Sequence, residues 1–344
     1  MQDPGEFRTE GTGAPLLAPD YTQKAKKDFL MLGIGLLLFI GVSSVIQILV
    51  QSLTAVFLPE LSQEPWYLWT LSLVPLYAVG FPLLLLLFRT VPAEKREKKN
   101  MPWYVWFGVF TVSVFVMYVG NFIGTVVTTV ISLFKGSSVT PAIIDMLENS
   151  GTVWTVFAVV IAAPVMEELI CRKLVIDRVR RYGELTAALF SATAFGMIHG
   201  NFSQFFYAFG LGFIFAWVYL KTGRVIYTML LHASINLLGG VIGPMILRNV
   251  NMDALNESDP QKILEYLVSG GLREMAPLFL YTGAMLSMAL VGAILLLIFR
   301  KKIVFLPAEE PIEKGKRFKT VYLNIGVALF ILFCLGLFVL SILQ

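Results

Sequence analysis

The sequence predicts an all-α fold, a polytopic integral membrane helical bundle with eight to nine transmembrane helices. Of the 344 residues 57% are hydrophobic and only 15% are charged, and the mean hydropathy is +0.75. A soluble domain carries about 25% charged residues. Apolar stretches of about 20 residues, each long enough to cross about 30 Å of hydrocarbon, recur along the chain. Each span is expected to be helical because a lipid-exposed backbone must satisfy its own hydrogen bonds.

The apolar stretches predict nine spans. In chain order these are 29–50, 66–88, 103–134, 152–172, 185–200, 203–220, 225–247, 276–299 and 320–342. The alternative is eight spans, with 185–200 broken or re-entrant at Gly196 and Gly200. Residues 1–28 are polar and rich in Gly and Pro, which is typical of a disordered tail. We therefore expect a cytoplasmic tail over 1–28 and a single membrane domain over 29–344.

Lys and Arg are distributed unevenly between the two sides of the predicted bundle. With nine spans, 23 of the 27 Lys and Arg residues fall in five segments on one side, namely 1–28, 89–102, 172–184, 221–224 and 300–319. Cytoplasmic loops carry this excess, so we expect the N-terminus in the cytoplasm and the C-terminus outside. The net charge of +4 then faces anionic lipid, and no separate basic domain predicts nucleic-acid binding. The expected partners are membrane lipid and not nucleic acid.

Three charged residues interrupt an apolar stretch in "APVMEELICRKL", residues 162–173. They are Glu167, Glu168 and Arg172. A charge near the middle of a bilayer costs about 3 kcal/mol or more, so such residues are usually functional or paired. Glu168 and Arg172 are four residues apart and share a helix face, which predicts a pair.

The chain contains only two histidines, and both lie in or beside predicted spans. His199 follows Phe195 by four residues, and His232 precedes Asn236 by four, so the members of each pair share a helix face. A lone intramembrane histidine is more often structural than catalytic. Two histidines close in sequence to a pair of glutamates indicate a polar site inside the bundle.

The order Glu-Glu-x-x-x-Arg, Phe-x-x-x-His, His-x-x-x-Asn resembles the CPBP family of intramembrane peptidases. This group includes the type II CaaX prenyl endopeptidases and the bacterial bacteriocin-processing and immunity proteins, also called Abi proteins. The resemblance covers about residues 150–245, the expected catalytic core. It implies an endopeptidase that hydrolyses membrane-associated peptides or proteins, by CaaX-type C-terminal processing or by bacteriocin or leader-peptide processing. The resemblance implies that the substrate could be a lipid-modified protein. The sequence does not identify the substrate.

The residues themselves predict how such a site would work. Peptide hydrolysis needs an activated water, a stabilised oxyanion and a proton donor for the leaving amine. Glu167 beside His199 would take the proton from water, and His232 and Asn236 would donate hydrogen bonds to the oxyanion. The resemblance implies the same division, which leaves a supporting role for Glu168, Arg172 and Phe195.

Three alternatives stay open at this point. His199, His232 and Glu167 also form a common zinc ligand set, with water in the fourth position. We favour a metal-free glutamate mechanism without a cofactor, because no His-Glu-x-x-His occurs and Asn236 is a poor zinc ligand. A non-catalytic immunity or binding protein would keep the same fold. A transporter would often contain an inverted repeat, and none is evident.

The motifs do not explain how the site residues come to lie at the same depth in the bundle. At 1.5 Å per residue, Glu167 and His232 would lie about 8–12 Å from the cytoplasmic ends of their helices. His199 would lie about 20 Å along its span. A steep tilt, or a break near Gly196, would bring them together. The site is expected to open toward the cytoplasm.

Overall fold

The protein is an all-α, multi-pass membrane bundle. The computed structural model describes residues 20–139, 151–251, 254 and 259–343, and no strand occurs among them. Eight helices in this part of the chain are long and apolar enough to cross a membrane: Thr22–Phe57, Tyr67–Phe88, Trp103–Lys135, Thr152–Tyr182, Phe202–Thr222, Val225–Leu247, Pro260–Lys302 and Ile325–Leu343. The predicted fold class is therefore confirmed.

Several spans combine α-helical segments with π-helical or 3₁₀ turns. The first three spans and their connection are α1 (Thr22–Phe57), η1 (Pro59–Gln63), α2 (Tyr67–Val74), η2 (Pro75–Gly80), α3 (Phe81–Phe88) and α4 (Trp103–Lys135). The fourth is built from α6 (Thr152–Thr155), η3 (Val156–Ala162), α7 (Ala163–Glu168), η4 (Leu169–Ile176), α8 (Asp177–Val179) and η5 (Arg180–Tyr182). There follow α9 (Glu184–Met197), α10 (Phe202–Thr222), α11 (Val225–Asn236), η6 (Leu237–Ile242) and α12 (Gly243–Leu247). The last are α14 (Pro260–Tyr266), η7 (Leu267–Gly271), α15 (Leu272–Phe299), η8 (Arg300–Lys302), α16 (Arg317–Tyr322) and α17 (Ile325–Leu343).

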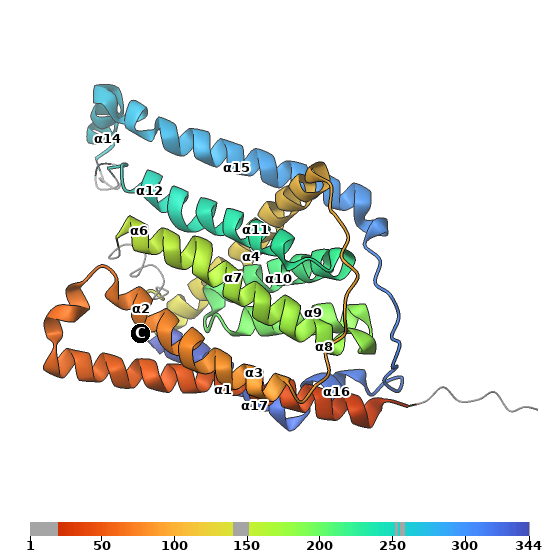
Figure 1. Cartoon of the computed structure of the whole chain (residues 1–344). Helices are drawn as coiled ribbons and strands as arrows, with labels where there is room; N and C mark the ends of the chain where they lie inside the picture. Colours follow the sequence, from red (N-terminus) through yellow and green to blue (C-terminus); the bar gives the residue numbers. More distant parts are fainter. Residues whose placement is uncertain (1–19, 140–150, 252–253, 255–258, 344) are drawn as a thin grey trace, which may run out of the picture.

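The segment predicted as a fifth span, 185–200, is not a full one. Helix α9 has 14 residues, which corresponds to about 21 Å and is shorter than the roughly 30 Å of a hydrocarbon core. It ends at Met197, and Gly200 takes a φ of 67° in the turn that follows. In the described part of the chain the number of spans is therefore that of the eight-span alternative, although α9 is continuous through Gly196. Because α9 still runs opposite to α10, α1 begins at one end of the bundle and α17 ends at the other (Figure 1).

Several predicted boundaries differ from those of the structure, and two of the differences affect the argument. The fourth span continues to Tyr182, ten residues beyond the predicted end at residue 172. Helix α1 begins at Thr22, inside the segment 1–28 that was expected to be a disordered tail. Residues 1–19 of that tail lie outside the described residues.

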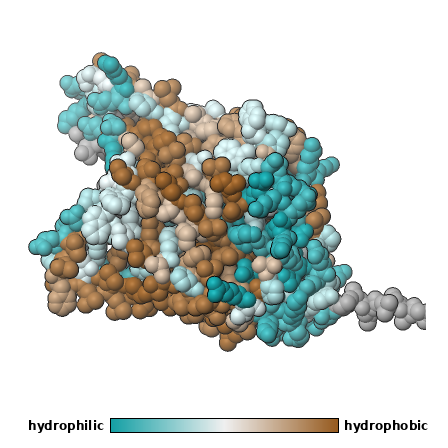
Figure 2. Space-filling view, in the orientation of Figure 1, coloured by the Kyte–Doolittle hydropathy of each residue, from teal (hydrophilic) through white to brown (hydrophobic). Residues whose placement is uncertain are grey.

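The segments rich in Lys and Arg lie together at one end of the bundle, here called the basic end. The amide of Glu94 donates to the carbonyl of Asp177 at 2.7 Å, and Lys24 pairs with Glu310 at 2.7 Å. Glu184 accepts hydrogen bonds from Lys221 at 2.7 Å and from the amide of Leu306 at 2.9 Å. Figure 2 shows hydrophilic residues gathered at this edge and hydrophobic ones across the middle of the visible face. The loops that the sequence placed on one side therefore do share one side.

Helix α10 lies between two hydrophobic cores. It packs against α9 and α4, and α4 in turn packs against α15. One core includes Phe195 of α9 together with residues of α1 and α17. The other includes Phe215 of α10 and Leu231 of α11. Side chains that lie between Phe195 and Phe215 are therefore shielded from lipid on both sides.

Replacing Glu184 with Gln is expected to lower the melting temperature in detergent at neutral pH. Burial raises the pKa of this carboxyl, but the hydrogen bonds from Leu306 and Lys221 outweigh that and leave the pKa below its ordinary value of 4.5. A lowered pKa stabilises the fold above the ordinary value, and this stabilisation disappears as the pH falls through the folded-state value. The difference in melting temperature should therefore shrink as the pH falls below about 4.5.

Glu309→Gln is the matched control for this prediction. Glu309 is 66% exposed and contacts Arg180 at 3.1 Å, so its loss should have little effect. A Glu184→Gln protein that melts like this control at neutral pH would contradict the prediction.

Candidate active site

A fully buried ion pair forms the centre of the site. Arg172 and Glu168 have 0% exposed side chains, and Arg172 Nε lies 2.9 Å from Glu168 Oε2. A second guanidinium nitrogen, Nη2, donates to Glu168 Oε1 at 3.1 Å. The third, Nη1, donates to Ser191 Oγ at 3.0 Å, and Ser191 donates to the carbonyl of Cys171 at 2.7 Å. Both Nη atoms therefore donate hydrogen bonds, and Nε faces Glu168 Oε2 as an ion-pair contact without hydrogen-bond geometry.

Aromatic rings enclose the same guanidinium group. The centroid of the Phe195 ring lies 4.6 Å from Arg172 Cζ, and that of Phe215 lies 5.7 Å away. Both distances are within the range of cation–π attraction, which is stronger where water is excluded. The supporting role expected for Phe195 thus has a physical basis, and Phe215 shares it.

His232 lies with its two ring nitrogens toward the two glutamates. Its Nδ1 is 3.2 Å from Glu168 Oε1, and its Nε2 is 3.9 Å from Glu167 Oε2. The Phe195 ring packs edge-on against the imidazole, with centroids 5.4 Å apart. Glu168 is completely enclosed, whereas the side chain of Glu167 is 19% exposed. Two neighbouring carboxylates therefore have different surroundings.

His199 lies in the turn that follows α9, on the other side of Phe195. Its Nδ1 is 2.7 Å from the Phe195 carbonyl, which can only accept, so Nδ1 carries the proton. The Nε2 atom of the neutral ring is then free to accept a proton or a hydrogen bond. The ring centroid lies 5.1 Å from that of Phe195, and Glu167 is close enough to interact with His199 electrostatically.

The corrected length of the fourth span accounts for the depth of His199. Glu167 precedes Tyr182, at the basic end, by 15 residues, and His199 follows Glu184, at the same end, by 15 residues. At 1.5 Å per residue, each corresponds to a depth of about 22 Å. The expected mismatch between Glu167 and His199 arose from ending the fourth span at residue 172.

Asn236 is held by a carbonyl that a proline leaves free. In the π-helical turn η3 each amide donates to the carbonyl five residues earlier, as Ala163 does to Ala158. The next residue, Pro164, has no N–H for the carbonyl of Val159. Asn236 Nδ2 donates to that carbonyl instead, at 2.8 Å. The local helix register therefore sets the position of the Asn236 side chain.

The described residues include the three possible zinc ligands, His199, His232 and Glu167. No group of three or more His, Cys, Asp or Glu side chains among them is arranged to hold a metal ion. His232 Nδ1 is taken by Glu168, and His199 Nδ1 by a carbonyl. Engagement of Nδ1 leaves Nε2 of each ring as the possible metal-binding atom, so a metal-free site stays a prediction.

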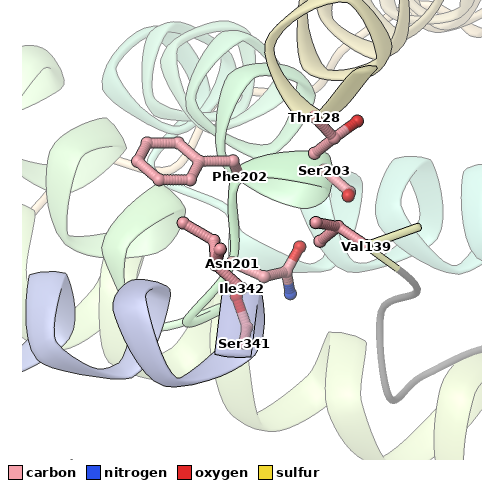
Figure 3. Close-up of a pocket in the computed structure, with 7 residues that line it drawn as sticks. All are labelled: Thr128, Val139, Asn201, Phe202, Ser203, Ser341 and Ile342. Carbon is pink, nitrogen blue, oxygen red and sulfur yellow. The ribbon is translucent and has the colours of Figure 1, made fainter. Parts of the chain in front are cut away.

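A small pocket adjoins the turn that carries His199. It lies between α4, α10 and α17 and is lined by Thr128, Val139, Asn201, Phe202, Ser203, Ser341 and Ile342 (Figure 3). Its volume of about 10 Å³ admits about one water molecule. It is too small to accept a peptide.

Sequence reasoning missed several partners of the motif residues. It did not identify Ser191 as a hydrogen-bond partner of Arg172, or the carbonyl of Val159 as the partner of Asn236. It also missed Thr228, which lies one turn before His232 and contacts Glu168. The spacing of four between Thr228 and His232 was a usable signal. The other contacts depend on how neighbouring helices are rotated.

Replacing Arg172 with Ala is expected to destabilise the protein by about 3–5 kcal/mol, because it leaves the charge of Glu168 buried without its partner. The variant Lys316→Ala is the control, since Lys316 is 57% exposed and its ion pair with the 46% exposed Glu313 should contribute about 0–1 kcal/mol. Expression and melting temperature in detergent measure the difference. An Arg172→Ala protein as stable as the wild type would contradict a supporting role for this pair.

Comparison with known proteins places the motif residues in a known family region. Residues 149–238 match the family model described as type II CAAX prenyl endopeptidase Rce1-like. The chain is 25% identical over 160 residues to "Putative membrane peptidase YdiL" of Bacillus subtilis, covering 45% of this chain and 64% of that protein. It is 27% identical over 128 residues to "UPF0177 protein YxdF" of Lactococcus lactis, covering 37% and 71% respectively.

The match spans less than two thirds of the length of YdiL, and no solved structure matches the chain significantly. The matched range 149–238 nevertheless contains every residue of the three motifs, from Glu167 to Asn236. The resemblance predicted from those motifs is therefore confirmed over residues 149–238, where the chain is similar to the type II CaaX prenyl endopeptidases.

Proposed function

We propose that this membrane protein is an intramembrane endopeptidase in which Glu167 and His199 activate the water. The observation that carries the proposal is the contrast between the two adjacent glutamates. Glu168 is enclosed and bound by Arg172 and His232, whereas Glu167 is partly exposed and lies 3.9 Å from His232 Nε2. A partly shielded carboxylate beside an imidazole is a suitable general base.

His199 supports Glu167 in this role. With its proton on Nδ1 and directed to the Phe195 carbonyl, its Nε2 is free to orient the water or to receive its proton. The proton taken from water then passes to the leaving amine, as the hydrolysis of a peptide bond requires.

His232 and Asn236 are the proposed oxyanion donors. Asn236 uses one N–H on the Val159 carbonyl, and the second N–H of the same amide is available to the substrate. His232 directs Nδ1 to Glu168, which fixes its ring, and a proton on Nε2 would donate to the oxyanion. With a proton on each nitrogen the His232 ring would be positively charged. The buried carboxylate of Glu168 would stabilise that charge.

The proposed substrate is a membrane-associated peptide or protein. The matched family description names CAAX prenyl endopeptidases, and YdiL is named as a membrane peptidase, so a lipid-modified C-terminus and a leader peptide are both candidates. We further propose that the basic end faces the cytoplasm, together with the N-terminus, on the positive-inside rule. That the site opens to the cytoplasm stays a prediction from the sequence.

Glu167→Gln, His199→Ala and His232→Ala are each expected to abolish proteolysis while the protein remains folded. Asn236→Ala should lower the rate by about 100- to 1000-fold, as the loss of one oxyanion donor does. Comparative peptidomics of membranes that contain the wild type or Glu167→Gln identifies the substrate, and turnover of that substrate by the purified variants measures the effect.

Glu309→Gln, an exposed change of the same chemistry at the basic end, is the control and should retain turnover. Near-normal turnover by Glu167→Gln would overturn the proposal. The same peptides in both membranes would point instead to a non-catalytic immunity or binding protein.

Treatment with a strong chelator is expected to leave activity unchanged, and elemental analysis of active protein should find no stoichiometric zinc. The reason is the donor set, because Asn236, one turn from His232, is a poor zinc ligand but a good oxyanion donor. About one zinc per chain, with activity lost on stripping and restored by zinc, would exclude the metal-free mechanism.

A further inference from the structure

A chain of hydrogen bonds in the first two turns of α10 connects His199 to Tyr207. Asn201, the N-cap of α10, donates from Nδ2 to the carbonyl of His199 at 2.9 Å and to Gln204 Oε1 at 2.7 Å. Its own Oδ1 accepts from the Gln204 amide at 2.9 Å. Gln204 Nε2 then donates to the Tyr207 hydroxyl at 2.9 Å. The backbone at His199 and the tip of Tyr207 are thereby fixed to the same two turns.

The ring of Tyr207 also packs against the imidazole directly. The centroids of the Tyr207 and His199 rings are 6.5 Å apart with an interplanar angle of 73°, an edge-to-face arrangement within the range of aromatic pairs. Tyr207 is close enough to Glu167 to interact with it electrostatically. It therefore borders His199, one of the two residues that the proposed mechanism assigns to the water.

Helix α4 prevents Tyr207 from moving back. A Cβ atom at Gly120 would overlap the backbone of Tyr207, and one at Gly124 would lie 2.9 Å from the carbonyl oxygen of Ser203. Small residues four apart allow such close contact between membrane helices. The backbone of α10 at Tyr207 is thus packed directly on α4, while its hydroxyl is held by Gln204.

We propose that Tyr207 is a positioning residue that, held by Gln204 and Gly120, fixes the imidazole of His199 toward Glu167. The inference that His199 then acts on water rests on the proposed function. The positioning of the imidazole does not rest on the proposed function, and it can be measured separately. The imidazole of His199 thus has two ring contacts, to Phe195 and to Tyr207.

The chain has only two histidines. The imidazole NMR signals of protein labelled with isotopes at histidine, in detergent, therefore report on each ring separately. For this measurement the protein is purified with a tag that contains no histidine. The signals that disappear in His199→Gln are assigned to His199. Tyr207→Leu and Gln204→Leu should each shift the His199 signals and leave those of His232 in place. Tyr207→Phe keeps the ring and should produce a smaller shift.

Tyr219→Phe is the matched control, because Tyr219 lies on the same helix and its hydroxyl donates to Asp177 at 2.8 Å at the basic end. It should move neither set of signals. Unchanged His199 signals in Tyr207→Leu, or an equal shift in Tyr219→Phe, would overturn the proposal. If Tyr207→Leu does not fold, Gln204→Leu decides the question by the same criterion.

Kinetics on an identified substrate complete the test. Misplacing a reacting group by about 1 Å can cost about 100-fold in rate, so kcat should fall by up to that factor while KM stays near the wild-type value. If kcat and the melting temperature both fall while the His199 signals stay unchanged, Tyr207 is merely a structural residue. That outcome would overturn the proposal. Shifted His199 signals in a protein without any peptidase activity would uphold the positioning role and reject the proposed function alone.

Discussion

The site depends on the ion pair between Arg172 and Glu168, which lies completely enclosed within an apolar bundle. Removing two charges from water costs several kcal/mol for each ion, and their attraction offsets this only when the remaining donors and acceptors have partners. Ser191 supplies one such partner and Phe195 and Phe215 supply two ring faces. Because these residues come from α9 and α10, the pair fixes the fourth span against both helices. Glu168 also binds His232, so the same pair orients α11.

Irregular helix geometry positions the remaining polar group. A regular α-helix would pair the Val159 carbonyl with the amide of Ala163, but the π-helical register directs that amide to Ala158. Since Pro164 has no N–H, the carbonyl remains free for Asn236. On the other helix, the π-helical turn η6 begins directly after Asn236. Such turns are frequent at functional sites because they release backbone groups that a regular helix would use itself.

The sequence predicted the apolar spans and the motif residues, because length and composition decide the first and spacing along a helix indicates the second. It did not predict the end of the fourth span, since basic residues after Arg172 suggested a loop. These side chains find partners within the bundle instead, as Arg178 does on the carbonyl of Phe88 and Arg181 on that of Pro92. Contacts between helices, such as that of Glu168 with His232, depend on helix rotation. Spacing within a single helix carries no information about that rotation.

Helix rotation also explains why two identical neighbours have different roles. Consecutive residues on a helix point about 100° apart, so Glu167 and Glu168 cannot face the same partners. Arg172, one turn after Glu168, shares its face and holds it toward Ser191 and His232. That contact fixes the rotation of the helix, and Glu167 is consequently directed to the partly exposed side beside His232 Nε2. A change that rotates the helix to free Glu168 would turn Glu167 away from both histidines. The buried pair therefore determines which of the two carboxylates is partly exposed.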